Sequence, residues 1–365
     1  AQPPPKSPQQ SPHHRGIMPA AIIEFVDVTV NVGGVTADKF AFGIPIGVFT
    51  FTSTISPDRQ HGPFFSLAEV VADGFSSIAE PAIYAWASAV FSQGDGVDSL
   101  LIGQQTAGDA GDYTVTMDAI EAEGSDTWYI TNIESRADAD VADVAAWTES
   151  RDKIAIFQSD DAGLVAALAL QGFGYNRSAL IYHDDDSEYL DGAWTSSGGG
   201  LNLDTPGGVG IWAYRSLSGV PFDDVTGTFA NSIYGADANL YGRNKGLSFT
   251  SKGTMASGRF IDTTTTVDWV KLRTEEAVLE TFVNAGTKVP YTNAGISIIV
   301  GSVQGVLDQG VSFGHFSGDA PPTVSAPDVS EVSTADKTNR VLSLTAQATL
   351  AGAIQKLELT INLAF

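Results

Sequence analysis

The chain has 365 residues, a formal net charge of −24 and no cysteine. The absence of cysteine excludes disulfides, thiol nucleophiles and cysteine-ligated metals. The acidic charge argues against nucleic acid as a partner, because phosphate binding depends on lysine and arginine. A 43% hydrophobic composition with 38 glycines predicts a globular protein rich in strands and turns. We see no apolar run of the roughly 18 residues that cross a bilayer, and we therefore expect a soluble protein without a membrane anchor.

The charge is unevenly distributed along the chain. Asp95 to Glu149 contains thirteen acidic residues and one basic residue, Arg136, whereas Leu240 to Glu275 contains six basic and three acidic residues. The acidic region of one copy could therefore dock on the basic region of another. The alternative is that the acidic charge only maintains solubility.

The N-terminal part predicts a tail followed by strands and helices. Residues 1–17 are rich in proline and glutamine, which does not favour a packed element. Valines alternate with polar residues over 26–32 and predict a half-buried strand. The apolar stretch 40–53 predicts a second strand, in which Pro45 is expected at an edge or bulge. Ser66 and Glu69 form a capping box at a helix start, and a longer helix is predicted over 81–93 with proline in its first turn.

The middle of the chain alternates between short strands and helices. We predict strands at 100–102, 113–117, 128–130, 154–157 and 180–183, and helices at 137–148 and 162–170, the second capped by Asp160 or Asp161. This alternation indicates α/β or α+β layering. Residues 213–265 look irregular, and a further helix is predicted over 267–283.

The stretch "KVPYTNAGISIIVGSVQGVLDQGV" (288–311) predicts a helix with Thr292 as N-cap and Gly310 just past its end. One face is apolar, with Ile296, Ile299, Val300, Val303 and Leu307. Gly301 and Gly305 on the other face weaken the helix by roughly 1 kcal/mol each. They are useful if another backbone approaches closely; ordinary core packing is the alternative. Two strands are then predicted, over 342–350 and 357–365.

Candidate catalytic patterns are weak. "GVSFG" at 310–314 matches the G-x-S-x-G nucleophile elbow, but a predicted helix precedes Ser312 where an elbow needs a strand. His183, Asp184, Asp185 and Asp186 carry metal-binding groups, but consecutive residues rarely converge on one ion, so we interpret them as a solvated turn. We expect no catalytic residue, no cofactor and no metal.

Several segments, taken in order, resemble the contractile-tail sheath proteins of phages. "FAFGIPIGV", "SLAEVVADGF" and "PAIYAWASAVFSQ" are similar to that family's early strand and first two helices. "IAIFQSDD" and "GYNRSALIYHDDDSEYLDGAW" resemble its central α/β part, and the stretch from "SGRFIDTTTTVDWV" to "VPYTNAGISIIVGSVQGVLDQGV" resembles its C-terminal part. The likeness covers about residues 22–312.

The resemblance implies a mixed α/β (α+β) fold with two domains. Residues 22–54 and 240–365 would form a sheath-type core with terminal strand arms, residues 55–239 an inserted, acidic, outward-facing α/β domain, and residues 1–21 an extended tail. Strands at both termini are easy donors for β-augmentation of neighbouring subunits. The expected arm residues are Val26, Val28, Val30, Leu357, Leu359, Ile361 and Leu363. The alternative is that both strands pair within their own subunit.

The resemblance also implies a function and partners. The chain would be a virion structural subunit, assembled in the host cytoplasm, that polymerises as hexameric rings or a helix around a tail tube. Contraction would then drive the tube through the host envelope. Further implied partners are the baseplate and tail terminator proteins. Arg259, Lys271 and Arg273 are candidate charges facing the tube or a neighbour. The competing interpretations are an acidic secreted hydrolase and a non-contractile virion structural protein.

Overall fold

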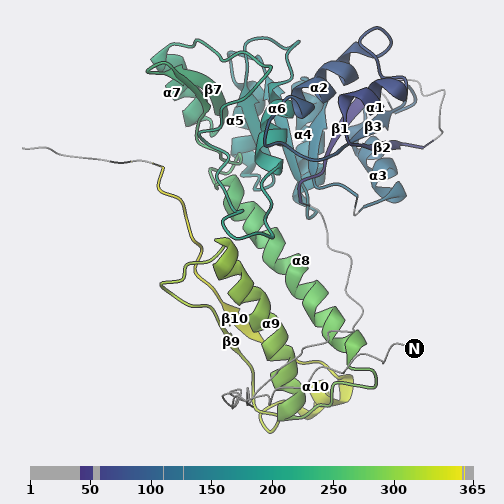
Figure 1. Ribbon diagram of the computed structural model, residues 1–365, viewed down its shortest axis with the longest axis vertical. Helices are drawn as coiled ribbons and strands as arrows, with labels where there is room; N and C mark the ends of the chain where they lie inside the picture. The colour runs from purple at the N-terminus through teal and green to yellow at the C-terminus, as the bar shows by residue number, and fades with distance from the viewer. Residues whose placement is uncertain (1–41, 52–57, 110, 126, 356, 358–365) are drawn as a thin grey trace, which may run out of the picture. The chain divides into compact units, whose positions relative to one another are not determined.

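The computed structural model describes residues 42–51, 58–109, 111–125, 127–355 and 357, all within the compact unit Thr36–Phe365. The expected arm strand at 26–32, and the expected C-terminal arm strand apart from Leu357, lie outside the described residues. Figure 1 shows the elements. They are β1 (Pro45–Thr50), β2 (Gln60–Phe64), α1 (Leu67–Ala72), α2 (Pro81–Phe91), β3 (Leu100–Gln105), α3 (Tyr113–Glu123), β4 (Ile130–Ile133), α4 (Asp138–Glu149), β5 (Ile154–Ser159), α5 (Val165–Phe173), β6 (Ser178–Tyr182), α6 (Leu190–Gly199), α7 (Gly227–Gly235), β7 (Asn239–Asn244), β8 (Leu247–Thr250), α8 (Ile261–Asn284), α9 (Asn293–Phe313), β9 (Thr323–Ser325), α10 (Thr334–Asn339) and β10 (Thr345–Gln347).

The main sheet has eight strands in the order β2-β3-β1-β4-β5-β6-β7-β8. The six central strands, β3 to β7 in that order, are parallel, and the two edge strands β2 and β8 pair antiparallel. The order around β1 is that of doubly wound α/β folds, in which the chain first extends the sheet on one side of β1 and then on the other. The predicted mixed α/β class is therefore confirmed.

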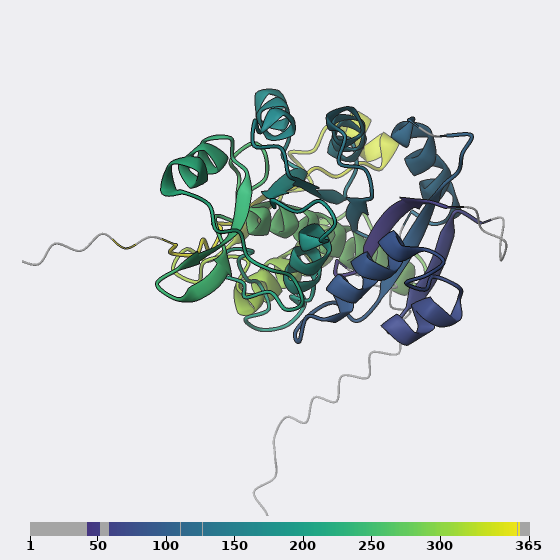
Figure 2. The same cartoon turned by 90° about the horizontal axis from the view of Figure 1, so that it is seen from above.

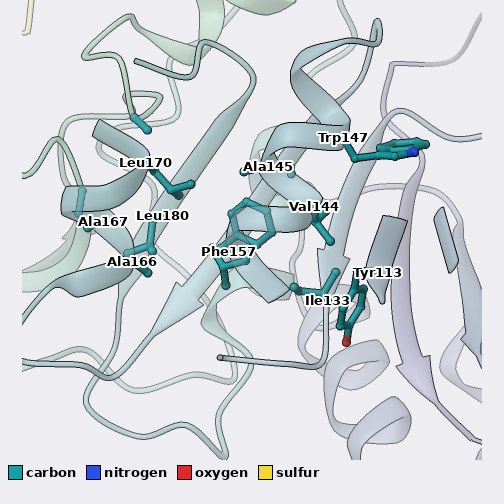
Figure 3. Packing of buried hydrophobic residues seen from close by; sticks show 14 of the residues in the cluster. Tyr113, Ile133, Val144, Ala145, Trp147, Phe157, Ala166, Ala167, Leu170 and Leu180 are labelled. Atoms are coloured by element: carbon teal, nitrogen blue, oxygen red, sulfur yellow. The ribbon is translucent and has the colours of Figure 1, made fainter. Parts of the chain in front are cut away.

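Helices cover both faces of this sheet (Figure 2). On one face α3, α4, α5 and α7 bury an apolar layer against the strands, including the residues labelled in Figure 3. On the other face, α6 and the end of α2 pack with the first turns of α8 and the last turns of α9, and α1 packs beside α2. Strands β3, β4, β5 and β6 are buried along their whole length, as expected for parallel strands covered on both sides.

Two sequence predictions about strands were wrong. Residues 113–117 begin helix α3, capped by the Asp112 carboxylate, which accepts from the Val115 amide. The alternation there was misleading because the buried positions recur at helical spacing, while Val115 is 48% exposed. Pro45 is not at an edge or bulge: it is the first residue of β1, a central strand. Proline is tolerated there because the first residue need not donate to the ladder.

The region 213–265 is more regular than predicted. It contains α7 and the β7–β8 hairpin, whose turn residues Lys245 and Gly246 both have positive φ. That backbone matches the two-residue hairpin turns that follow the natural twist of strands.

Helices α8 and α9 form an antiparallel pair, and α8 begins against the sheet (Figure 1). Thr292 caps α9 as predicted, with its hydroxyl accepting from the Gly295 amide. Gly310 does not end the helix, which continues to Phe313 and closes at Gly314 with φ 96°. Glycine is needed at 310 for a different reason: a Cβ there would lie 2.5 Å from the Phe316 ring.

The last described strands are short. β10 covers only Thr345–Gln347 of the strand predicted over 342–350, and it pairs antiparallel with β9. β9 packs beside α9, and all three β10 residues are exposed.

Among the described helices, α9 is the one that is long and apolar enough to cross a membrane. Its most apolar 18 residues have a mean hydropathy of 1.3, and 28% of them are buried. The expectation of no such segment was therefore wrong by this measure. Core helices of soluble proteins can be as long and apolar as this one, and the buried side of α9 packs with Val306 and Leu307 in the apolar layer that contains Trp269.

The expected domain limits are at 54/55 and 239/240, and the described strands on both sides of each limit belong to the main sheet. β1 precedes the first limit and lies between β3 and β4, while β7 and β8 form one end of the same sheet. Pairing in a parallel sheet joins segments distant in sequence, so the strand residues on either side of each limit form one structural layer.

Candidate assembly surface

Asp268 anchors α8 to the amino-terminal edge of the main sheet. Its carboxylate accepts from both Arg177 guanidinium nitrogens at 2.7 Å and from the Tyr129 hydroxyl at 2.6 Å. Tyr129 and Arg177 directly precede β4 and β6. Burial, and next the nearby Asp268 carboxylate, raise the pKa of Tyr129 well above its usual range. The phenol therefore stays protonated and can donate.

A second contact is made by the next residue of α8, Trp269. The Trp269 indole donates to Asp204 at 2.9 Å and stacks on the His315 ring, with centroids 4.1 Å apart. The His315 Nε2 faces the Leu203 carbonyl at 3.0 Å, and its Nδ1 faces the Thr266 hydroxyl at 2.9 Å. Because a carbonyl only accepts, Nε2 carries the proton. Burial lowers the pKa of His315 and favours this neutral form.

The three charges predicted to face the tube or a neighbour differ in their surroundings. Arg273 is buried and paired with Asp204 at 2.6 Å and Glu276 at 2.8 Å. Lys271 is exposed and pairs with Asp152. Arg259 is exposed, and no ion pair of its side chain is found within the described ranges. Among the described residues, Arg259 is therefore the one of the three charges without an ion-pair partner.

Beyond Arg273, α8 has no fully buried residue. Leu279, Phe282 and Val283 are 57%, 51% and 53% exposed. At spacings of three and four residues they share one face of the helix. Asp268 and Leu272 lie on the same face, nearer the sheet. α9 packs on the opposite face, where its Ser302 hydroxyl donates to the Ala277 carbonyl. We call Leu279, Phe282 and Val283 the α8 apolar stripe. Such a cluster on a surface indicates an interaction site.

Two glycines, Gly301 and Gly305, lie on the outer face of α9. A Cβ added at Gly301 or Gly305 would meet no protein atom within 4 Å. No described part of the chain therefore approaches these two glycines closely.

We expect Gly310→Ala to destabilise the subunit by about 1–3 kcal/mol, because the added methyl overpacks the Phe316 ring. Gly301→Ala is the matched control in the same helix, and its higher helix propensity should stabilise the isolated subunit by up to about 1 kcal/mol. Urea unfolding of the three proteins measures both effects. Equal stabilities of the two variants would contradict the packing assigned to Gly310.

The G-x-S-x-G pattern is not a nucleophile elbow. Ser312 lies in the last turn of α9, and the neighbouring His315 is buried with both ring nitrogens engaged. An elbow instead presents its serine between a strand and a following helix.

The carboxyl ends of β1 and β4, where doubly wound sheets commonly bind ligands, are occupied by polar contacts. The Thr50 amide donates to Glu134 at 2.9 Å, and Arg136 pairs with the fully buried Asp191 at 2.7 Å. These side chains satisfy one another, which is typical of a structural network.

These features define a doubly wound α/β sheet carrying a long, partly exposed helical hairpin. Residues 261–319, which begin at the first residue of α8, match the family model "E217 tail sheath protein gp31-like, C-terminal domain". The resemblance predicted from the sequence is thereby confirmed.

Two solved structures share the fold over nearly the whole chain. The anti-feeding prophage (AFP) baseplate structure matches with a TM-score of 0.66 at 13% identity, covering 94% of this chain and 99% of that one. The sheath complex of an extracellular contractile injection system (PVC), in its contracted state, matches with a TM-score of 0.63 at 10% identity, covering 93% and 96%. No curated protein matches the sequence.

Sequence reasoning missed the residues that dock α8. Asp268 carried a signal in the sequence. It lies beside Trp269 and one turn before Leu272, and a carboxylate on a buried face of a helix has to be paired. Its partners carried none, because Tyr129 and Arg177 lie 139 and 91 residues away in sequence.

Proposed function

We propose that this chain is the structural subunit of a contractile sheath, which polymerises around an inner tube and shortens to drive the tube through an envelope. The observation that carries the proposal is the α8–α9 hairpin, because residues 261–319 match the model of a sheath domain. The fold of the chain as a whole agrees: more than nine-tenths of it superposes on components of contractile particles. The tube, baseplate and terminator proteins remain the proposed partners.

Contraction of this kind needs no catalytic site. A polymer with two packings can store free energy in its subunit contacts and release it when the packing changes. The paired polar groups at the usual ligand edge of the sheet support a structural role over hydrolysis.

The α8 apolar stripe is assigned to a neighbouring copy of the chain. A sheath that contracts must release the tube, whereas its subunits must stay joined throughout. Permanent interfaces are the more apolar class, so the apolar stripe suits the lasting contact, and exposed charges such as Arg259 suit the tube.

The terminal strands are proposed as the links that keep subunits joined. The β9–β10 pair has exposed residues and only two described strands, and it could accept a strand from a neighbour. Val26, Val28 and Val30 would contribute one donated strand, and the C-terminal arm from Leu357 the other. Leu357 itself is 82% exposed.

Negative-stain electron microscopy of the purified chain tests the proposal. We expect hollow tubes or stacked rings from the full chain, and their loss when Leu357–Phe365 is removed. Tubes that survive truncation would remove the C-terminal arm from the proposal but keep the sheath. Small particles from the full chain, with and without added tube protein, would overturn the sheath assignment.

A further inference from the structure

A polar cluster lies at the carboxyl end of β6, on the opposite edge of the main sheet from Asp268. His183 and Asp184 follow the strand directly. Asp223 comes from the segment before α7, and a β-bridge to Gly242 holds its backbone. The carboxyl ends of parallel strands are where such sheets place ligand-binding side chains.

The three side chains are spaced as metal ligands are. His183 Nδ1 lies 2.9 Å from Asp223 Oδ1 and 4.0 Å from Asp184 Oδ1, and one ligand atom from each residue lies within 4.8 Å of the others. Zinc with tetrahedral bonds of about 2.1 Å places its ligands about 3.4 Å apart. The two distances to His183 fall on either side of that value, so small side-chain movements complete the geometry.

Burial leaves part of the cluster unsatisfied. Asp223 Oδ1 faces the His183 ring nitrogen at 2.9 Å and accepts from the Asp184 amide at 2.9 Å. Its other oxygen, Oδ2, is buried and has no hydrogen-bond partner among the described residues. The His183 Nε2 is also buried without a partner there, so the imidazole is held through Nδ1 alone. A buried carboxylate oxygen without a partner is unfavourable, and a cation would correct it.

Access to the cluster comes from the side of Asp184. Its side chain is 66% exposed, whereas those of His183 and Asp223 are 1% and 0% exposed. An ion bound here would therefore have two ligands fixed by the fold and one at the surface.

We propose that His183 Nδ1 and the carboxylates of Asp184 and Asp223 bind a divalent cation of the zinc class. The ion takes the place of the proton between His183 and Asp223, offsets the charge of two adjacent carboxylates, and ties β6 to the segment that leads into α7. The site goes beyond the proposed sheath function and departs from the sequence expectation of no metal. Consecutive residues could not surround an ion, but Asp223 supplies the missing ligand from 40 residues away.

Equilibrium dialysis of the chelator-treated full chain against Zn²⁺ at physiological salt, with metal measured by mass spectrometry, tests the site. We expect one tightly held ion per chain. Asp184→Asn should weaken its binding at least tenfold, since loss of a ligand should matter no less than the 10–100-fold effects of outer-sphere partners. Asp186→Asn removes the same charge two residues away on the exposed turn and should leave the affinity unchanged.

The controls separate a specific site from the general attraction of an acidic chain. Asp184 is exposed, so its variant should fold, and circular dichroism checks this. His183→Gln should also lose the ion. The proposal is overturned if the wild type holds no stoichiometric zinc, or if Asp184→Asn and Asp186→Asn bind it equally.

Discussion

Replacing Asp268 with alanine should lower the free energy of unfolding by about 3–5 kcal/mol. The variant leaves the Arg177 guanidinium, only 16% exposed, without its bidentate partner, and removes the acceptor of the buried Tyr129 hydroxyl. Breaking a buried ion pair by removing one partner costs about this much, because the remaining charge stays desolvated. Urea unfolding followed by tryptophan fluorescence measures the change, and Trp269 lies beside the altered position.

Asp152→Ala provides the comparison. Asp152 pairs with Lys271, and the two side chains are 40% and 48% exposed. It also lies 3.5 Å from the Arg177 guanidinium, a longer contact than the 2.7 Å pair that Asp268 makes. Surface ion pairs of this kind contribute about 0–1 kcal/mol. Asp268→Asn should lie between the two alanine variants, since an amide keeps an acceptor for Tyr129 without the negative charge. A loss below 1 kcal/mol for Asp268→Ala would show that Asp268 does not anchor α8.

The double variant Leu279→Gln, Val283→Gln should weaken assembly while leaving the subunit folded. Both side chains are more than half exposed, and surface changes of this type usually alter stability by less than 0.5 kcal/mol each. If a neighbouring copy covers the stripe, each substitution loses about 1 kcal/mol of association free energy. This is about half of what burying a whole aliphatic side chain contributes, because each side chain is about half exposed in the subunit. The sum of about 2 kcal/mol raises the critical concentration for polymerisation about 30-fold.

The matched control lies on α5. Leu168 and Val165 are 51% and 53% exposed, so Val165→Gln, Leu168→Gln makes the same two substitutions on the sheet domain. Light scattering across a concentration series, with electron microscopy of the pellets, compares the two variants. Equal effects on polymerisation would show that the α8 apolar stripe is not an interface between copies.

Local signals predicted local structure well. Ser66 with Glu69, and Thr292, each cap the helix that they were expected to begin. Asp161 accepts from the amide of Val165, the first residue of α5, although this helix begins three residues later than predicted and its N-cap is Leu164. Caps are readable because the donor and acceptor lie within four residues of each other. The same locality misled the prediction over 113–117, where five alternating residues fit a strand and only the longer spacing to Ile120 reveals a helix.

Close packing between distant segments could not be predicted from the sequence. Gly310 was correctly singled out but given the wrong role, because a glycine near a helix end commonly marks its stop. What requires glycine there is the Phe316 ring after the turn. The two glycines on the outer face, Gly301 and Gly305, predict either a close backbone approach or ordinary core packing, and no described atom of the chain lies near them.

By itself, the sequence determined the composition class, most of the helices with their caps, the central α/β alternation and the sheath resemblance of its C-terminal part. These properties depend on spacing within a few turns of chain or on the order of segments. Only the tertiary structure decided that β1 lies between β3 and β4 inside an eight-stranded sheet, that Arg273 is buried in ion pairs, and that Asp223 contacts His183. Each depends on contacts between residues that the chain separates widely, and burial makes such polar contacts strong because it removes the water that would otherwise compete for them.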